Sequence, residues 1–97
     1  MAALDGGTPL MQGERGVETA ASWMRYYAGW CDKLTGDLMS TFDTRGEFSY
    51  SVPEPIGIVG IINTWNGPLI GMGMKVSPAL AAGNCVIRKP AEITPFA

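Results

Sequence analysis

The residues of this chain whose types and spacing could support chemistry lie in its last third. Asn66 falls between an apolar run and a helical pattern, and Lys89 and Glu92 follow the next apolar run. A side-chain amide can donate a hydrogen bond to a developing oxyanion. A lysine can bind phosphate or ribose oxygens, and a carboxylate can accept hydrogen bonds from ribose hydroxyls. The set therefore contains one candidate oxyanion donor and two candidate nucleotide contacts.

Each of these residues also has a structural interpretation. Asn66 stands two residues before Pro68, where it can help to start a helix. Lys89 is typical of a solvated strand end, and Glu92 is typical of an exposed position ahead of a Thr-Pro pair. Trp65 is more often a packing residue than a stacking platform. The residue types alone leave the structural and the chemical interpretations open.

The order of elements over residues 54–97 predicts a parallel βαβ unit. Residues 56–63 are apolar on both faces, which is typical of a strand inside a parallel sheet. Pro68 suits the first turn of a helix, and residues 85–87 form a short second strand. In such a unit the loop after the first strand opens at the carboxyl edge of the sheet, where open α/β folds bind ligands. We therefore expect the candidate residues to share that edge.

Glycine, asparagine and proline positions refine this unit. Gly57 and Gly60 are expected to let a helix pack closely on the sheet, and a Gly-Asn pair at residues 83–84 ends the helical pattern. Pro78 is expected to kink the helix or to break it into two pieces. The pair at residues 94–95, Thr-Pro, is typical of the cap and first position of a further helix.

The first part of the chain predicts one amphipathic helix. Apolar residues from Val17 to Leu34 recur at three- and four-residue steps, and Gly36 fits a C-terminal stop just after Lys33 in the last turn. Residues 1–16 contain several glycines and are interpreted as a turn with short connections. A second, aromatic face of the helix predicts a second neighbour; its residues are Trp23, Tyr26 and Trp30.

The next stretch, residues 37–53, predicts a β-hairpin. Phe48, Tyr50 and Val52 alternate with serines at the two-residue period of a half-buried strand, and residues 43–46 are a candidate turn. A lone hairpin is marginal in water, so this one is expected to need a partner surface. The chain is thereby divided into three parts: a connection with a helix over residues 1–36, the hairpin over 37–53, and the start of the βαβ unit over 54–97.

Composition narrows the classes of function. The net charge of −2 provides no basic patch, so nucleic acid is not an expected partner. No apolar run approaches the ~18 residues of a spanning helix, so no membrane partner is expected. The 97 residues include no histidine, which excludes a His-based triad within the chain and disfavours a metal site. At 46% hydrophobic and 16% charged residues, the chain is apolar for its length, which suggests faces that something absent should cover.

The cysteines carry little chemical signal. Cys31 and Cys85 are too few for a disulfide scaffold and point to a reducing compartment, so a cytoplasmic location is expected. Both are interpreted as small buried hydrophobic residues. Because neither has an evident base beside it, neither is predicted to be a nucleophile.

The usual dinucleotide fingerprint, G-x-G-x-x-G, is absent after the first strand, as is a Walker motif. Residues 54–97 nevertheless resemble the amino-terminal part of the cofactor domain of the NAD(P)-dependent aldehyde dehydrogenase superfamily, and residues 25–33 resemble the helix that precedes the hairpin there. The residues that match the family pattern are Glu54-Pro55, Gly57, Gly60, Ile62, Trp65-Asn66, Pro68-Leu69, Lys75, Pro78-Ala79-Leu80-Ala81, Gly83-Asn84 and Lys89-Pro90-Ala91-Glu92-Ile93-Thr94-Pro95.

The resemblance implies an α/β fold, a fragment of a Rossmann-type domain with a helix, a β-hairpin and then a parallel βαβ unit. Asn66 matches the asparagine whose amide helps to hold the substrate carbonyl oxygen in the oxyanion hole. Lys89 and Glu92 match the pair that contacts the adenosine ribose. The family binds its dinucleotide without the glycine fingerprint, in agreement with its absence here. The cofactor contacts that the resemblance implies are Ile62, Asn63, Thr64, Trp65, Lys89, Ala91 and Glu92.

The resemblance also implies ligands and partners. An aldehyde is the expected substrate and NAD the expected cofactor; NADP is the alternative, which Glu92 disfavours by repelling a 2′-phosphate. The hairpin matches the start of the family's oligomerisation surface, so a homodimer or homotetramer is expected. Two departures stand out: Thr64 replaces the usual proline, and Gly67 replaces a common aromatic residue that would narrow the substrate entrance.

The family's catalytic cysteine and general-base glutamate lie beyond the segment that this chain matches. Covalent catalysis on an aldehyde needs an activated thiolate facing the oxyanion donors, and the chain carries only the donor. We therefore interpret the chain as an internal piece of a longer aldehyde dehydrogenase, inactive alone. The alternative is a non-catalytic, truncated remnant that binds a cofactor.

Overall fold

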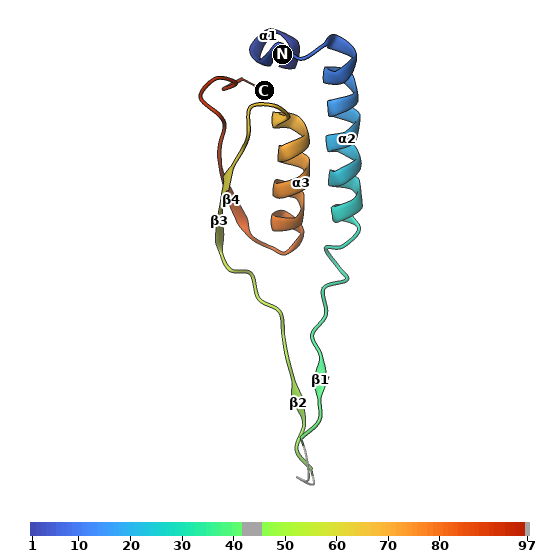
Figure 1. Ribbon diagram of the computed structural model, residues 1–97. Coiled ribbons are helices and arrows are strands. Elements are labelled where there is room, and N and C mark those ends of the chain that lie inside the picture. Colours follow the sequence, from blue (N-terminus) through green and yellow to red (C-terminus); the bar gives the residue numbers. More distant parts are fainter. Residues whose placement is uncertain (42–45, 97) are drawn as a thin grey trace.

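The computed structural model describes residues 1–41 and 46–96. The helices and the longer strands form a body, and the two short strands extend from it as an arm, giving an overall extent of 66 × 23 × 17 Å (Figure 1). The elements are α1 (Ala2–Gly6), α2 (Leu10–Ala28), β1 (Leu38–Met39), β2 (Ser49–Tyr50), β3 (Ile58–Ile62), α3 (Pro68–Ala81) and β4 (Cys85–Lys89). This order confirms the predicted helix, hairpin and βαβ unit.

The βαβ unit has the predicted parallel register. Strand β3 pairs with β4 from Ile58 opposite Cys85 to Ile62 opposite Lys89. Helix α3 connects the two strands and begins with Pro68 in its first turn, where the missing N–H costs nothing. Both strands therefore end at the same edge, the edge at which α3 begins.

The predicted Gly-Asn stop closes α3. Gly83 has φ +80°, which favours glycine. The side chain of Asn84 is buried and donates from Nδ2 to the Ala79 carbonyl at 3.1 Å, while its Oδ1 accepts from the Gly57 N–H at 3.0 Å. One side chain thus ties the end of α3 to the start of β3.

The predicted break of α3 at Pro78 is wrong. The helix is continuous from Pro68 to Ala81. Pro78 stands in the last turn, so the helix loses a single N–H donor there, and the Ala82 N–H still reaches the Pro78 carbonyl at 3.1 Å. A proline this close to the helix end interrupts too little of the hydrogen-bond ladder to split the helix.

The predicted bounds of the first long helix are also wrong. Helix α2 begins at Leu10 and ends at Ala28, not at residues 17 and 34, and α1 occupies part of the predicted turn region. Gly13 and Gly16, which suggested a turn, lie inside α2 on the side where other elements approach: Gly16 is buried, and a Cβ on Gly13 would be 3.7 Å from Ala2 Cβ. Tertiary contact has overridden their low helix propensity.

Helix α2 ends earlier than the apolar pattern predicts because its last turn tightens. The Gly29 N–H donates to the carbonyls of Arg25 and Tyr26 at 3.3 and 3.2 Å, a shared bond that is common at helix ends. The Lys33 amine then donates back to the Gly29 carbonyl. The lysine that was expected in the last turn of the helix therefore closes it from outside.

Helices α2 and α3 run side by side and meet through small residues (Figure 1). A Cβ placed on Gly73 would be 2.8 Å from Ala20 Cα and 3.0 Å from its carbonyl oxygen. Ala20 is 5% exposed, and Gly73 is buried as well. Glycine at position 73 therefore sets the close approach of the two helices.

The sheet is covered on one face only. Ile61 points under α3 and is 6% exposed, whereas Ile58, Ile62 and Ile87 on the other face are each about two-thirds exposed or more. The predicted close packing of a helix at Gly60 is wrong for the described residues, because a Cβ there would meet nothing within 4 Å. The exposed isoleucines agree with the expectation of faces that this chain does not cover.

The hairpin is present but short. Leu38 pairs with Tyr50 and Met39 with Ser49, antiparallel as predicted. The predicted strand over residues 48–52 narrows to two residues, and Phe48 and Tyr50 are both exposed. Residues 43–45 of the predicted turn lie outside the described residues. The helix predicted to start at Thr94 is not seen in the described residues, where residues 95–96 form a turn.

Candidate functional site

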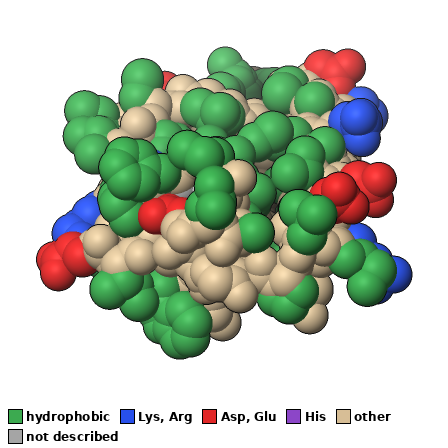
Figure 2. Space-filling view, turned by 90° about the horizontal axis from the view of Figure 1, so that it is seen from above, with side chains coloured by type: hydrophobic (Ala, Val, Ile, Leu, Met, Phe, Trp, Pro, Cys, Tyr) green, Lys and Arg blue, Asp and Glu red, His purple; other side chains and the backbone are tan. Residues whose placement is uncertain are grey.

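The candidate residues flank the two strand ends. The Asn63 N–H donates to the Lys89 carbonyl at 3.0 Å and extends the ladder of β3 and β4 by one bond. The chain leaves β3 through a loop over residues 63–67 and leaves β4 through a turn over residues 90–96. Figure 2 views this end of the molecule and shows hydrophobic side chains spread over it, with most of the charged side chains toward its left and right margins.

Lys89 and Glu92 form an ion pair at this edge. Their Nζ and Oε1 atoms are 3.8 Å apart, and the side chains are 62% and 91% exposed. The Lys89 Nζ also donates to the Pro90 carbonyl at 3.3 Å. An exposed ion pair contributes little to stability. The pair can therefore reorganise around a ligand without a large loss of folding energy.

Asn66 has a free amide at the mouth of a cavity. In the described part of the chain its side chain makes no hydrogen bond, and α3 has Gly67 at its N-cap without a side-chain cap. The helix-starting interpretation of Asn66 is therefore not supported. The cavity is about 90 Å³, and most of its lining residues are small or apolar; they are Ala2, Thr8, Gln12, Gly13, Gly16, Asn66, Gly67, Pro68, Leu69 and Ile70.

Asn63 has a different position from its neighbours in the loop. Its side chain is 4% exposed, and its Nδ2 donates to the Pro68 carbonyl at 2.8 Å. A Cβ on Gly71 would be 3.4 Å from Asn63 Oδ1, so the glycine leaves room for the amide. The side chain of Asn63 supports the first turn of α3, and only its backbone remains to line the edge.

The other predicted loop contacts are open to solvent. Ile62 and Trp65 are 74% and 57% exposed, and Thr64 is exposed as well, while Ala91 is partly covered. The packing interpretation of Trp65 is therefore wrong within this chain. These side chains surround the strand ends without filling the space between them.

One contact at this edge was missed by the sequence analysis. The Lys75 amine, from the second turn of α3, donates to the Ile62 carbonyl at 2.7 Å. It satisfies the last carbonyl of β3 and joins the helix to the strand. The available signal was a single lysine inside an otherwise apolar helical pattern.

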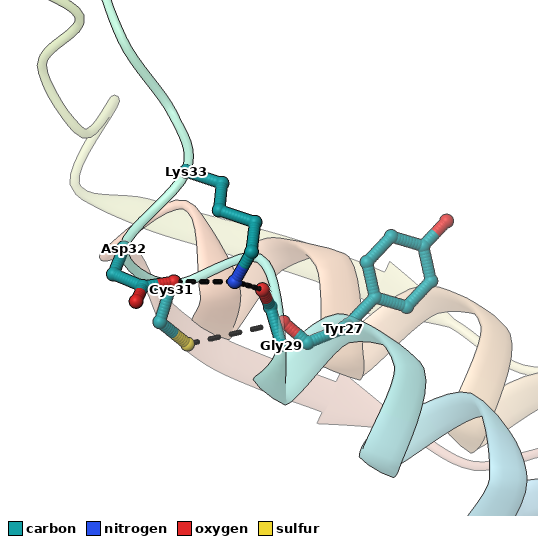
Figure 3. A network of polar contacts seen from close by, with 5 residues as sticks. All are labelled: Tyr27, Gly29, Cys31, Asp32 and Lys33. Carbon is teal, nitrogen blue, oxygen red and sulfur yellow. Dashed lines mark hydrogen bonds and ion pairs between the residues drawn. The ribbon is translucent and has the colours of Figure 1, made fainter.

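Neither cysteine lies near Asn66. Cys85 opens β4, at the opposite end of the strand from Lys89, and Cys31 follows α2, where its sulfur points toward the Tyr27 carbonyl at 3.9 Å (Figure 3). Both thiols are exposed, so the prediction of buried cysteines is wrong. The reason is that Cys85 lies on the uncovered sheet face and Cys31 lies beyond the helix end.

The described residues, 1–41 and 46–96, offer neither a metal site nor a membrane-spanning helix. No three residues of the types His, Cys, Asp and Glu come together there in a way that could hold a metal ion. None of the helices in this part of the chain is long and apolar enough to cross a membrane.

The helices, the antiparallel strand pair and the parallel βαβ unit define a small α/β fold. Residues 1–97 match the family model described as "Aldehyde dehydrogenase family". The chain belongs to the aldehyde dehydrogenase family. It is 41% identical over 95 residues to an aldehyde dehydrogenase of Agaricus bisporus, and 42% identical over 94 residues to a betaine aldehyde dehydrogenase of Bacillus subtilis; each alignment covers 97% of this chain.

Solved structures agree with this assignment. Betaine aldehyde dehydrogenase from Staphylococcus aureus in complex with NAD+ superposes with a TM-score of 0.90 at 35% identity, covering 97% of this chain and 18% of that one. PnpE in complex with nicotinamide adenine dinucleotide superposes with a TM-score of 0.92 at 38% identity, covering 98% and 19%. The chain spans about 19% of the length of the curated relatives that it matches, and it aligns with their amino-terminal part.

Proposed function

We propose that the protein to which this chain belongs oxidises an aldehyde to a carboxylic acid, with NAD as the preferred hydride acceptor and NADP as the alternative. The observation that carries the proposal is the family match over residues 1–97, combined with a free Asn66 amide and a Lys-Glu pair at one sheet edge. In this proposal the chain supplies the oxyanion donor and part of the cofactor site. The thiolate and the general base come from other parts of the protein.

The pair of Lys89 and Glu92 suits a nucleotide ribose. A ribose diol can both donate and accept hydrogen bonds, so it pairs with one cationic donor and one carboxylate acceptor. The two side chains are 3.8 Å apart and exposed, which lets them bind neighbouring hydroxyls. Glu92 would also repel a 2′-phosphate, which supports NAD over NADP. When bound, the cofactor accepts the hydride from the substrate.

The loop after β3 gives this cofactor edge its shape. We propose that Ile62, Thr64 and Trp65 contact the cofactor with their exposed side chains, together with Ala91 from the turn after β4. Asn63 contributes through its backbone, since its amide is held by the Pro68 carbonyl. The Lys75 bond to the Ile62 carbonyl keeps the strand end in register beneath the loop.

Asn66 is proposed to act on the substrate oxygen. As the carbonyl carbon is attacked, negative charge develops on that oxygen, and a preorganised donor stabilises the charge more than the neutral ground state. The Asn66 amide lines the cavity and makes no hydrogen bond elsewhere in the described residues, so no internal contact must be broken first. Gly67 keeps the cavity mouth open beside it.

The proposed setting of the enzyme is a cytoplasmic homo-oligomer. The arm formed by β1 and β2 exposes Leu38, Phe48 and Tyr50, which a lone chain leaves in water. Large apolar side chains gathered on an extended hairpin are typical of an interface. A dimer or tetramer that covers this arm is therefore part of the proposal.

Steady-state kinetics of the longer protein tests the proposal. The intact protein should reduce NAD in the presence of an aldehyde, and Asn66→Ala should lower kcat by about 10²-fold, as the loss of one oxyanion donor does. Asn66→Asp is the size-matched control: it keeps the volume but removes the N–H donor, so it should be at least as slow. Wild-type turnover with an unaffected Asn66→Ala variant would refute the role of Asn66.

A second outcome would distinguish the alternative, a non-catalytic protein that binds the cofactor, from the proposed enzyme. If the wild-type protein binds NAD but reduces none with any aldehyde, the non-catalytic cofactor-binding remnant is the correct description. Binding is measured by titration with NADH, whose fluorescence changes on transfer from water to a protein site. Absence of both binding and turnover would reject both functions.

A further inference from the structure

We infer that Asp5 on α1 is a positioning residue for the cofactor turn over residues 90–96. The Asp5 Oδ2 atom accepts a hydrogen bond from the Phe96 N–H at 2.9 Å. The two residues are 91 positions apart in the sequence, and Figure 1 shows the two ends of the chain close together above β3 and β4. This inference rests on the proposed cofactor role of Lys89 and Glu92.

A second contact joins α1 to the same turn. A Cβ on Gly6 would be 3.2 Å from Thr94 Cγ2, which is a tight separation, and 3.9 Å from the Trp65 carbonyl oxygen. Thr94 is 1% exposed, the most completely buried side chain in the described residues. Helix α1 therefore touches both halves of the candidate site, the loop after β3 and the turn after β4.

The turn over residues 90–96 makes few hydrogen bonds within itself, so it depends on an acceptor from another part of the chain. The Thr94 N–H donates to the Ala91 carbonyl at 3.2 Å, which closes the middle of the turn. The Thr94 hydroxyl is buried and has no hydrogen-bond partner among the described residues. Asp5 provides the acceptor for the last N–H of the turn, and a bond from an N–H to a carboxylate is stronger than one between neutral groups.

Lys89 and Glu92, the two residues proposed to bind the cofactor, are held in different ways. The loss of Asp5 is therefore expected to affect only one of them. Lys89 belongs to β4, and its backbone is fixed by the pairing with Ile62 and by the bond from Asn63. Glu92 belongs to the turn, and the position of the turn depends on the contact between Asp5 and Phe96. Loss of Asp5 should therefore displace Glu92 from Lys89 and leave the Asn66 loop and β4 in place.

The test measures NADH affinity and turnover in the intact protein. Asp5→Ala should raise the Kd for NADH roughly 3- to 10-fold, the effect of losing one charge-assisted hydrogen bond at a partly exposed site, while kcat at saturating NAD changes by less than about 2-fold. Asp5→Asn keeps a carbonyl acceptor and should restore the Kd to within about 2-fold of wild type. Asp32→Ala removes the same charge from an 82%-exposed side chain beyond the C-terminal end of α2 and should leave the Kd unchanged.

A second variant tests the positioning without removing the carboxylate. Gly6→Ala would press against Thr94 Cγ2 and should also weaken NADH binding while thermal unfolding of the protein stays cooperative. An unchanged Kd for both Asp5→Ala and Gly6→Ala overturns the inference. An equal rise of the Kd in Asp32→Ala overturns it as well. If wild type binds NADH but oxidises no aldehyde, the proposed function fails while these Kd values still decide the role of Asp5.

Discussion

The body and the arm of this molecule are held by different means. In the body, polar side chains join separate elements: Asn84 joins the end of α3 to the start of β3, Lys75 satisfies the Ile62 carbonyl, and Asp5 holds the turn after β4. In the arm, β1 and β2 are held by a two-residue ladder and by bonds between Asp37 and Ser51, and the aromatic side chains are exposed.

The difference shows which part of the structure the chain specifies by itself. The internal bonds of the body need no other molecule, and those of Lys75 and Asp5 lie at the edge that carries Asn66 and the Lys-Glu pair, so this chain builds that edge itself. The arm and the bare sheet face carry apolar side chains such as Phe48 and Ile87 that are about two-thirds exposed or more. Apolar area of this kind gains stability only when something covers it.

The largest expected effect is on the contact between the helices of the body. Gly73→Ala would place a Cβ 2.8 Å from Ala20 Cα, and because backbone atoms cannot rotate away, the helices must separate. We expect the free energy of unfolding to fall by about 2–3 kcal/mol, measured by urea denaturation. Gly13→Ala is the matched helix control: its Cβ would meet Ala2 at an ordinary 3.7 Å, so it should stabilise by about 0.5–1 kcal/mol. Equal effects of the two changes would refute this account of the packing.

A second prediction contrasts the two asparagines that flank α3, Asn66 before its start and Asn84 after its end. Asn84→Ala removes the acceptor of the Gly57 N–H and the donor to Ala79, and should lower the free energy of unfolding by about 2 kcal/mol. Asn66→Ala removes no internal hydrogen bond, so it should change this free energy by less than about 0.5 kcal/mol. Thermal and urea unfolding of both variants give the comparison. A destabilised Asn66→Ala variant would mean that this residue supports the fold, not the chemistry.

The smallest effect on stability is expected in the arm. Phe48→Ser replaces a side chain that is 73% exposed, so the free energy of unfolding of the body should change by less than about 0.5 kcal/mol. The same change should weaken self-association in the proposed oligomer, measured by sedimentation velocity. Strong destabilisation of the monomer, or an unchanged association constant, would show that the arm does not serve as an interface.

Much of the fold follows from local patterns. The parallel unit was predictable because Pro68, the Gly-Asn pair at residues 83–84 and two apolar runs mark its boundaries by local chemistry. The bounds of α2 were not predictable in this way, since Gly13 and Gly16 oppose a helix locally and are tolerated because of their tertiary neighbours. The position of Pro78 relative to the end of α3 likewise decides whether it breaks the helix.

The residues of the candidate site were predicted from the sequence, but the contacts that hold them in place were not. Residue type and spacing placed Asn66, Lys89 and Glu92 at one edge, and the structure brings the last two within 3.8 Å. Asn63 was grouped with the exposed loop, although its side chain turns inward to the Pro68 carbonyl. The role of Asp5 had no sequence signal, because its partner is 91 residues away and is a backbone N–H that any residue type offers.

The most direct test of the central claim is the KM for NAD of the intact protein after changing the pair at the strand ends. If the carboxyl edge of β3 and β4 is the ribose site, Lys89→Ala and Glu92→Ala should each raise the KM for NAD by roughly 10-fold, the loss of about 1.4 kcal/mol of binding, with kcat at saturating NAD nearly unchanged. The double variant should lose less than the sum of the two free energies, because both residues bind one group. An unchanged KM for NAD in both single variants would contradict the account.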